Sequence, residues 1–184
     1  MGLCIGMLVS TNILADSKPL SPSRSDQLAN VAEDQSREFD KLQKAADAFF
    51  DHLRLAAPQH SKSDKIFIER EHQGRVKSFY ALIARLKNNE VPNVSHEEFI
   101  ASNQRFDKIY NILMRDVPDH VKDKTMKASD IRVTQKKWLR YRDAFIHFVS
   151  AKYPAISKET ISVLLTNERS IVLEKLLQTL QTQS

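Results

Sequence analysis

The chain has 184 residues, of which 28% are charged and 41% are hydrophobic, a balance that is typical of a soluble folded protein and excludes an intrinsically disordered chain. It contains only 3 glycines and 6 prolines, which favours long uninterrupted elements, and its single cysteine excludes an internal disulfide framework. The length suits one domain with a sizeable core, and the formal net charge of +5 favours anionic partners without identifying one.

The first 15 residues, MGLCIGMLVSTNILA, carry no charged side chain. They are too few to span a bilayer and resemble the apolar core of a secretory signal, with Ile13-x-Ala15 as the cleavage site. We therefore expect a signal peptide over 1–15, a flexible linker over 16–25, and a periplasmic or secreted mature chain without cysteine or transmembrane span. The alternative is an ordinary apolar N-terminal segment and a cytoplasmic location, because no positive charge precedes the apolar run.

Apolar residues of the next part recur every three or four positions, which is the spacing of one helical face. This spacing predicts one helix over about 26–56 and a second over about 63–87, which together form an N-terminal hairpin over 26–90. The side chains expected to face inward are Leu28, Val31, Phe39, Leu42, Ala46, Phe49, Leu53, Ile66, Val76, Phe79, Tyr80, Ile83 and Leu86.

The remaining sequence predicts three further helices. Ser95, followed three positions later by Glu98, is typical of a capping box and predicts a helix to about residue 115. The next helix begins at about residue 119 or later and ends at 152 before Pro154, and the last is capped by Ser157 and reaches about residue 179. The apolar residues of this last helix are Ile161, Leu164, Leu165, Ile171, Val172, Leu176 and Leu180.

No segment alternates with a period of two, so no sheet is expected. The sequence predicts an all-α bundle of about five helices in antiparallel hairpins. The bundle forms a single helical domain over 26–184, with a three-helix part over 95–180.

One arginine lies inside the apolar face of the fourth predicted helix. That face carries Ile131, Gln135, Trp138, Arg142, Phe145 and Val149. Because Trp138 and Arg142 are four residues apart, we expect a cation–π contact between them. A buried guanidinium also needs a carboxylate, so we predict that Arg142 is a structural clamp paired with Glu168 or, second, Asp107. An anion-binding role of Arg142 is the alternative.

Three short motifs follow one another in the second half of the chain: FDKIYN at 106–111, QKKWLRYRDA at 135–144 and LTNER at 165–169. In this order they resemble the LprI-like lysozyme-inhibitor family over about residues 99–177. The resemblance implies a small, non-enzymatic helical protein of the bacterial envelope that inhibits a lysozyme-type peptidoglycan hydrolase. The residues that carry its structural motif here are Asp107, Tyr110, Asn111, Gln135, Trp138, Arg142, Asp143, Glu168 and Arg169.

Charged surfaces suggest two kinds of partner. Arg132, Lys136 and Arg140 recur every four residues opposite the apolar face and form a candidate anion-binding face. The alternative to lysozyme inhibition is therefore an envelope adaptor that binds an anionic partner, such as an envelope polymer, through this face. Nucleic acid is not expected, because no aromatic residues are interleaved with these cations.

A protein with a net charge of +5 would be repelled at long range by a typical basic lysozyme. Inhibition would therefore require a local acidic docking patch, for which Glu90, Glu97 and Glu98 are the candidates.

Signals of catalysis are missing from the sequence. The six histidines are scattered, and Glu69 with His72 is the nearest approach to a metal-ligand pair, which we interpret as part of a solvated face. There is no glycine-rich phosphate loop and no nucleophile elbow. The sequence therefore predicts a binding protein that is not an enzyme and has no catalytic residues, metal or cofactor.

Overall fold

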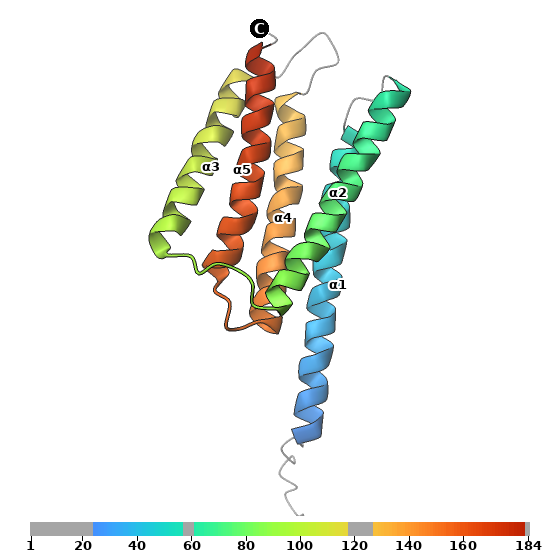
Figure 1. The fold of residues 1–184 in the computed structure, drawn as a ribbon, viewed down its shortest axis with the longest axis vertical. Coiled ribbons are helices and arrows are strands. Elements are labelled where there is room, and N and C mark those ends of the chain that lie inside the picture. The colour runs from blue at the N-terminus through green and yellow to red at the C-terminus, as the bar shows by residue number, and fades with distance from the viewer. Residues whose placement is uncertain (1–23, 57–60, 118–126, 183–184) are drawn as a thin grey trace, which may run out of the picture.

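The computed structural model describes residues 24–56, 61–117 and 127–182. It contains the helices α1 (Arg24–Ala56), α2 (Lys62–Lys87), α3 (His96–Asp116), α4 (Ala128–Lys152) and α5 (Lys158–Thr182), and no strand in these ranges (Figure 1). The predicted all-α class and the five helices are therefore confirmed. The predicted signal peptide and residues 16–23 of the predicted linker lie outside the described residues, whereas Arg24 and Ser25 belong to α1.

Local hydrogen bonds explain where the helices begin and end. Ser95 and Glu98 form the predicted capping box at the start of α3, with Ser95 N donating to Glu98 Oε2 at 2.7 Å. Ser157 Oγ accepts from Thr160 N at 3.0 Å, as predicted for the start of α5. After α2, Asn89 has a left-handed backbone (φ 57°), which the short amide side chain tolerates and which stops the helix.

The helices pack as two pairs joined at the centre. α1 packs mainly along α4 and α3 mainly along α5, while α4 and α5 contact each other and α2 lies against α1 (Figure 1). The N-terminal hairpin and the three-helix part consequently share one core. No helix of the described residues is both long and apolar enough to cross a membrane.

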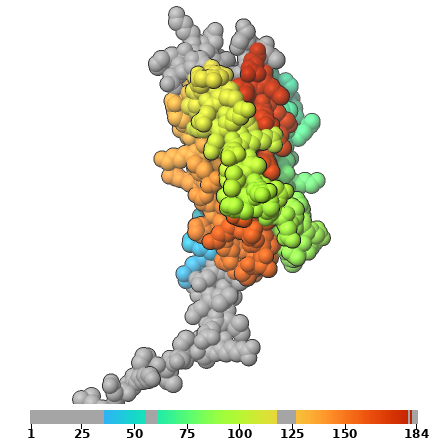
Figure 2. Space-filling model, turned by 90° about the vertical axis from the view of Figure 1, so that its left-hand side faces the viewer, coloured from blue at the N-terminus to red at the C-terminus, as the bar shows by residue number. Residues whose placement is uncertain are grey.

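Polar contacts set the position of α3 on α5. Arg105 donates two hydrogen bonds to the carboxylate of Glu174, at 3.0 and 2.7 Å, and Ser102 Oγ donates to Asn167 Oδ1 at 2.9 Å. Figure 2 shows α3 lying over α5 on this face of the molecule. α3 therefore covers one side of α5, and α4 is the other close neighbour of α5.

The inward faces were predicted only in part. Leu42, Ala46, Phe49, Phe79 and Leu86 are buried as expected. The predicted burial of Ile66 and Tyr80 is wrong, since these side chains are 54% and 47% exposed. The reason is that α2 packs closely only against α1 among the described helices and reaches α4 through the Phe79 side chain, so only a narrow face of α2 is covered. The side chains of Leu28, Val31 and Leu180 lie outside the described residues.

Candidate functional site

A pocket of about 360 Å³ opens between α2 and α5, over a floor supplied by α1 and α4. It exists because α2 reaches α4 only through large side chains: the Phe79 ring lies 5.9 Å from the Phe145 ring and 6.4 Å from the Tyr141 ring, centroid to centroid. The backbones therefore stay apart. The residues that line the pocket are Phe49, Phe50, Leu53, Arg75, Ser78, Phe79, Ala81, Leu82, Arg85, Trp138, Tyr141, Leu164, Leu165, Glu168, Arg169 and Val172.

Aromatic rings form the floor of this pocket. Tyr141 is buried and stacks on Phe49, with ring centroids 5.7 Å apart and planes 19° from parallel. Trp138 is also buried, and it stacks on Phe106 of α3 with ring centroids 5.2 Å apart. Because these rings are held by packing on several helices, the apolar floor is preformed.

Arg169 is the most unusual residue of the pocket. Its side chain is 5% exposed, and its Nε is buried without a hydrogen-bond partner among the described residues. The guanidinium carbon lies 5.7 Å from the centre of the Phe49 ring, which compensates only part of the cost of burying a charge. Burial, helped by the positive charge of Arg75, lowers the pKa of Arg169 to about 10. Arg169 is thus still a cation at neutral pH.

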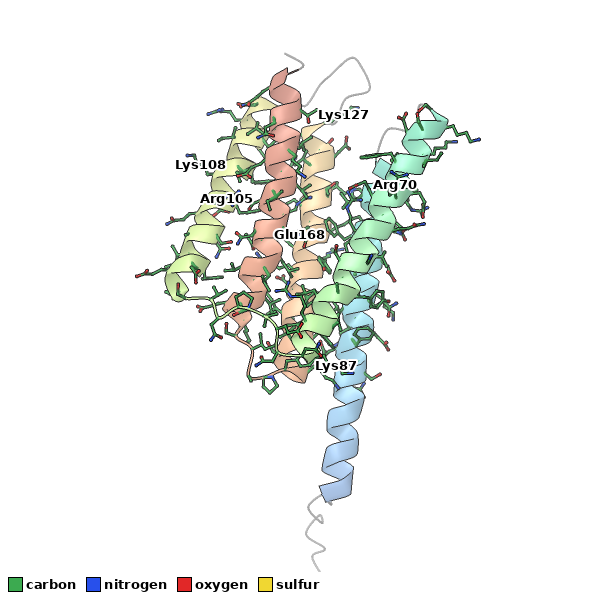
Figure 3. All side chains as sticks on the ribbon, viewed as in Figure 1. Arg70, Lys87, Arg105, Lys108, Lys127 and Glu168 are labelled. Atoms are coloured by element: carbon green, nitrogen blue, oxygen red, sulfur yellow. The ribbon has the colours of Figure 1, made fainter. Side chains whose placement is uncertain are left out.

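Glu168 lies on the side of α5 that faces α2 (Figure 3). Its side chain is exposed, yet desolvation by the protein around the carboxyl raises the pKa of Glu168, against the opposing effect of Arg75. Burial and the nearby Glu168 charge likewise raise the pKa of Tyr141, which keeps its phenol protonated. Three arginines and one glutamate line the pocket, so the formal charge of its lining is positive. Arg75 also pairs with Glu71 at 3.6 Å, and Arg85 Nε donates to the Glu90 carbonyl at 3.2 Å.

The predicted contact between Trp138 and Arg142 is confirmed, with the guanidinium carbon 5.2 Å from the indole centre. The predicted clamp is wrong, because Arg142 donates to the carboxylate of its sequence neighbour Asp143, at 3.2 Å. Arg142 is 25% exposed and turns toward solvent, whereas Glu168 faces α2 and Asp107 is exposed on α3. Arg142 therefore does not join helices through an ion pair.

The other residues of the predicted structural motif are divided between core and surface. Gln135 is buried, Tyr110 is half-buried beside Phe106, and Asn111 and Asp143 are exposed. Only Trp138, Glu168 and Arg169 of the predicted set line the pocket.

The two predicted charged surfaces are exposed. Arg132, Lys136 and Arg140 lie at the surface of α4. Glu90, Glu97 and Glu98 are exposed too, and hydrogen bonds from Ser95 lower the pKa of Glu98. Among the described residues, no group of three His, Cys, Asp or Glu side chains could hold a metal ion.

Sequence reasoning missed the pocket and the arginines of α2 that line it. A signal for Arg169 was nevertheless present, because Ile161, Leu165, Arg169 and Leu173 recur every four residues, with the arginine inside an apolar series. All three apolar members of that series are buried. The same reasoning that drew attention to Arg142 would have found Arg169.

No family model, no curated protein and no solved structure matches this chain. The resemblance to the LprI-like family therefore stays a prediction from the three motifs.

Proposed function

We propose that this chain is a non-enzymatic binding protein and that its ligand is an anion held in the pocket between α2 and α5. One observation carries the proposal: Arg169 is a buried cation whose Nε has no hydrogen-bond partner among the described residues. A buried charge is destabilising unless it is paired and hydrogen-bonded. An anionic ligand would supply the missing acceptor, and Arg75 and Arg85 would add attraction from α2.

The chemistry of the pocket favours binding over turnover. Its polar lining consists of three arginines, Ser78, Tyr141 and Glu168. No histidine or cysteine is among these residues, and Tyr141 is held in its protonated form.

Purification from the native host tests this function directly. The full chain and an Arg169→Met variant are isolated in parallel, and small molecules released by denaturation are compared by mass spectrometry. We expect an anion that is enriched in the parent sample and at least tenfold depleted in the variant. Equal recovery of every anion from both samples would contradict the proposal.

Inhibition of a lysozyme-type hydrolase is the second candidate, and it follows from the family resemblance. The observation that favours it is the exposure of Glu90 and Glu97, which would offer negative charge to a basic enzyme despite the net charge of +5. A location in the bacterial envelope remains part of this candidate.

A lysozyme activity assay separates the two functions. The double variant Glu90→Gln, Glu97→Gln should lose inhibition while retaining the pocket ligand, whereas Arg169→Met should do the reverse. Glu98 is left unchanged in this test because its carboxylate also caps α3. Absence of inhibition by the parent chain at micromolar concentration would remove this candidate.

A further inference from the structure

Most of the pocket lining is apolar. Leu53, Leu82 and Leu164 line it together with the aromatic floor. A purely charged ligand such as inorganic phosphate would leave these groups in contact with water and gain nothing from them. The volume of about 360 Å³ holds roughly a dozen non-hydrogen atoms, if each occupies about 30 Å³, the share of one molecule in liquid water.

The charged groups in turn restrict the head of such a ligand. Arg169 and Arg75 act on each other electrostatically and line the same pocket, so both can attract one anionic group. Glu168 lies in this pocket too, and its negative charge would repel a doubly charged phosphate more strongly than a singly charged group. A carboxylate is planar and accepts two parallel hydrogen bonds from a guanidinium, which is the geometry that an arginine offers.

We infer that the pocket binds an amphipathic monocarboxylate, with its carboxylate at Arg169 and an apolar body of about nine carbon atoms over Phe49, Tyr141 and Trp138. This inference rests on the proposed function and adds the chemical class of the ligand. The head and the body have separate energetic roles. The head neutralises the buried guanidinium, and the body covers the aromatic floor, so neither part alone should bind well.

Trp138 makes the inference measurable, because it is the only tryptophan of the chain and lines the pocket. The purified full chain is titrated at pH 7 with linear carboxylates from acetate to decanoate, below their micellar concentrations. Fluorescence and calorimetry are both recorded. Affinity should rise about three- to fourfold for each added methylene group until the pocket is full. Decanol, which lacks the charge, should bind at least about tenfold more weakly than decanoate.

Variants locate the binding. Arg169→Met keeps an apolar stem of similar length and should weaken decanoate binding by about tenfold or more, without weakening decanol. Arg140→Met is the matched control, because Arg140 is exposed on α4 and does not line the pocket, and it should retain full affinity. Ser78 lines the pocket and is exposed, so Ser78→Phe places a large ring there without altering any charge. This variant should block decanoate and decanol alike. This last variant decides the question if Arg169→Met does not fold.

The remaining outcomes overturn one or both proposals. If acetate or inorganic phosphate binds as tightly as decanoate, the ligand class is wrong while anion binding in the pocket stands. If decanoate binds equally well to the parent, Arg169→Met and Ser78→Phe, its site lies elsewhere and the inference fails. If no carboxylate and no phosphate binds, both this inference and the proposed function are wrong.

Discussion

At the scale of single residues, Arg169 lowers the stability of the folded protein and, in the proposed function, binds the ligand. Its guanidinium is buried beside Phe49 and near another cation, Arg75. A residue kept for ligand binding commonly lowers the stability of the unliganded protein, because the site is complementary to the ligand and not to itself. Arg142 differs, since it has both an aromatic neighbour and the carboxylate of Asp143.

Replacing Arg169 by Met should therefore stabilise the unliganded protein. We expect a gain of about 1–4 kcal/mol in the free energy of unfolding, the range found when buried ion pairs are replaced by apolar residues of similar volume. Arg142→Met should instead cost less than about 1 kcal/mol, as is usual for a partly exposed ion pair. Urea melts of the two variants beside the parent measure both values. A loss of stability in Arg169→Met would assign Arg169 to the fold and not to a ligand.

His52 provides a pH-dependent contact between α1 and α4. Its Nε2 lies 3.0 Å from Thr134 Oγ1, and Thr134 donates its own proton to the Asp130 carbonyl at 2.7 Å, so His52 Nε2 must be the donor. Burial lowers the pKa of His52, Lys137 lowers it further, and Asp130 opposes them. The folded state consequently favours the neutral imidazole.

The sign of the resulting pH dependence follows from linkage. A base whose pKa is lowered on folding contributes stability that is fully present above 6.5, its ordinary value, and that is lost as the pH falls below it. The free energy of unfolding should therefore decrease from pH 7.5 to pH 5. In His52→Gln, which can still donate to Thr134 but does not titrate, this decrease should be smaller. Urea melts at pH 5, 6 and 7.5 compare the two chains, and parallel pH profiles would exclude this role of His52.

At the scale of elements, the helix caps are the features that the sequence predicts most directly. The capping box at Ser95 satisfies two backbone donors at the start of α3, and α3 in turn is held on α5 by Arg105 and Ser102. A cap that fails would fray the first turn of α3 without disturbing these later contacts.

Ser95→Ala should therefore cost about 1 kcal/mol of stability, the usual value for loss of a helix cap. Ser36→Ala, at an exposed site of α1, serves as the control and should change stability by less than about 0.5 kcal/mol. Thermal and urea melts of both variants give the comparison. Equal effects of the two substitutions would show that the box contributes nothing measurable.

At the scale of the whole molecule, the helices are unequally held. α5 lies between α3 and α4, whereas α2 packs closely against α1 alone among the described helices and borders the open pocket (Figure 1). Regions with few packed neighbours open locally at lower free energy than the core. α2 is therefore the element that would move to admit a ligand.

Amide hydrogen exchange should reveal this difference. We expect the amides of α2 to exchange earlier than those of α4 and α5, and decanoate to slow the exchange of α2 more than that of α3. Mass spectrometry of proteolytic fragments measures both effects. Uniform protection of α2 and α5 in the absence of ligand would contradict the proposed order of opening.

The sequence by itself determined the helices of this protein. Their number, their order and most of their ends follow from apolar spacing, from the capping box at Ser95 and from the break after Lys87. These signals are local, because each depends on residues within one or two turns of the same helix. The Trp138–Arg142 contact was predictable for the same reason, since residues four apart on a helix are neighbours.

The tertiary structure alone decided which helices meet and what their faces contact. Arg142 and Arg169 occupy equivalent positions inside apolar series, yet one turns to solvent beside Asp143 and the other is buried in a pocket. Ile66 and Tyr80 are exposed for a related reason, because α2 has only one close neighbour. Burial and charge pairing depend on the packing of helices distant in sequence, which no local spacing records. The pocket, and in it the Arg169 Nε that has no hydrogen-bond partner among the described residues, therefore appear only when α2 and α5 are placed on either side of the aromatic floor.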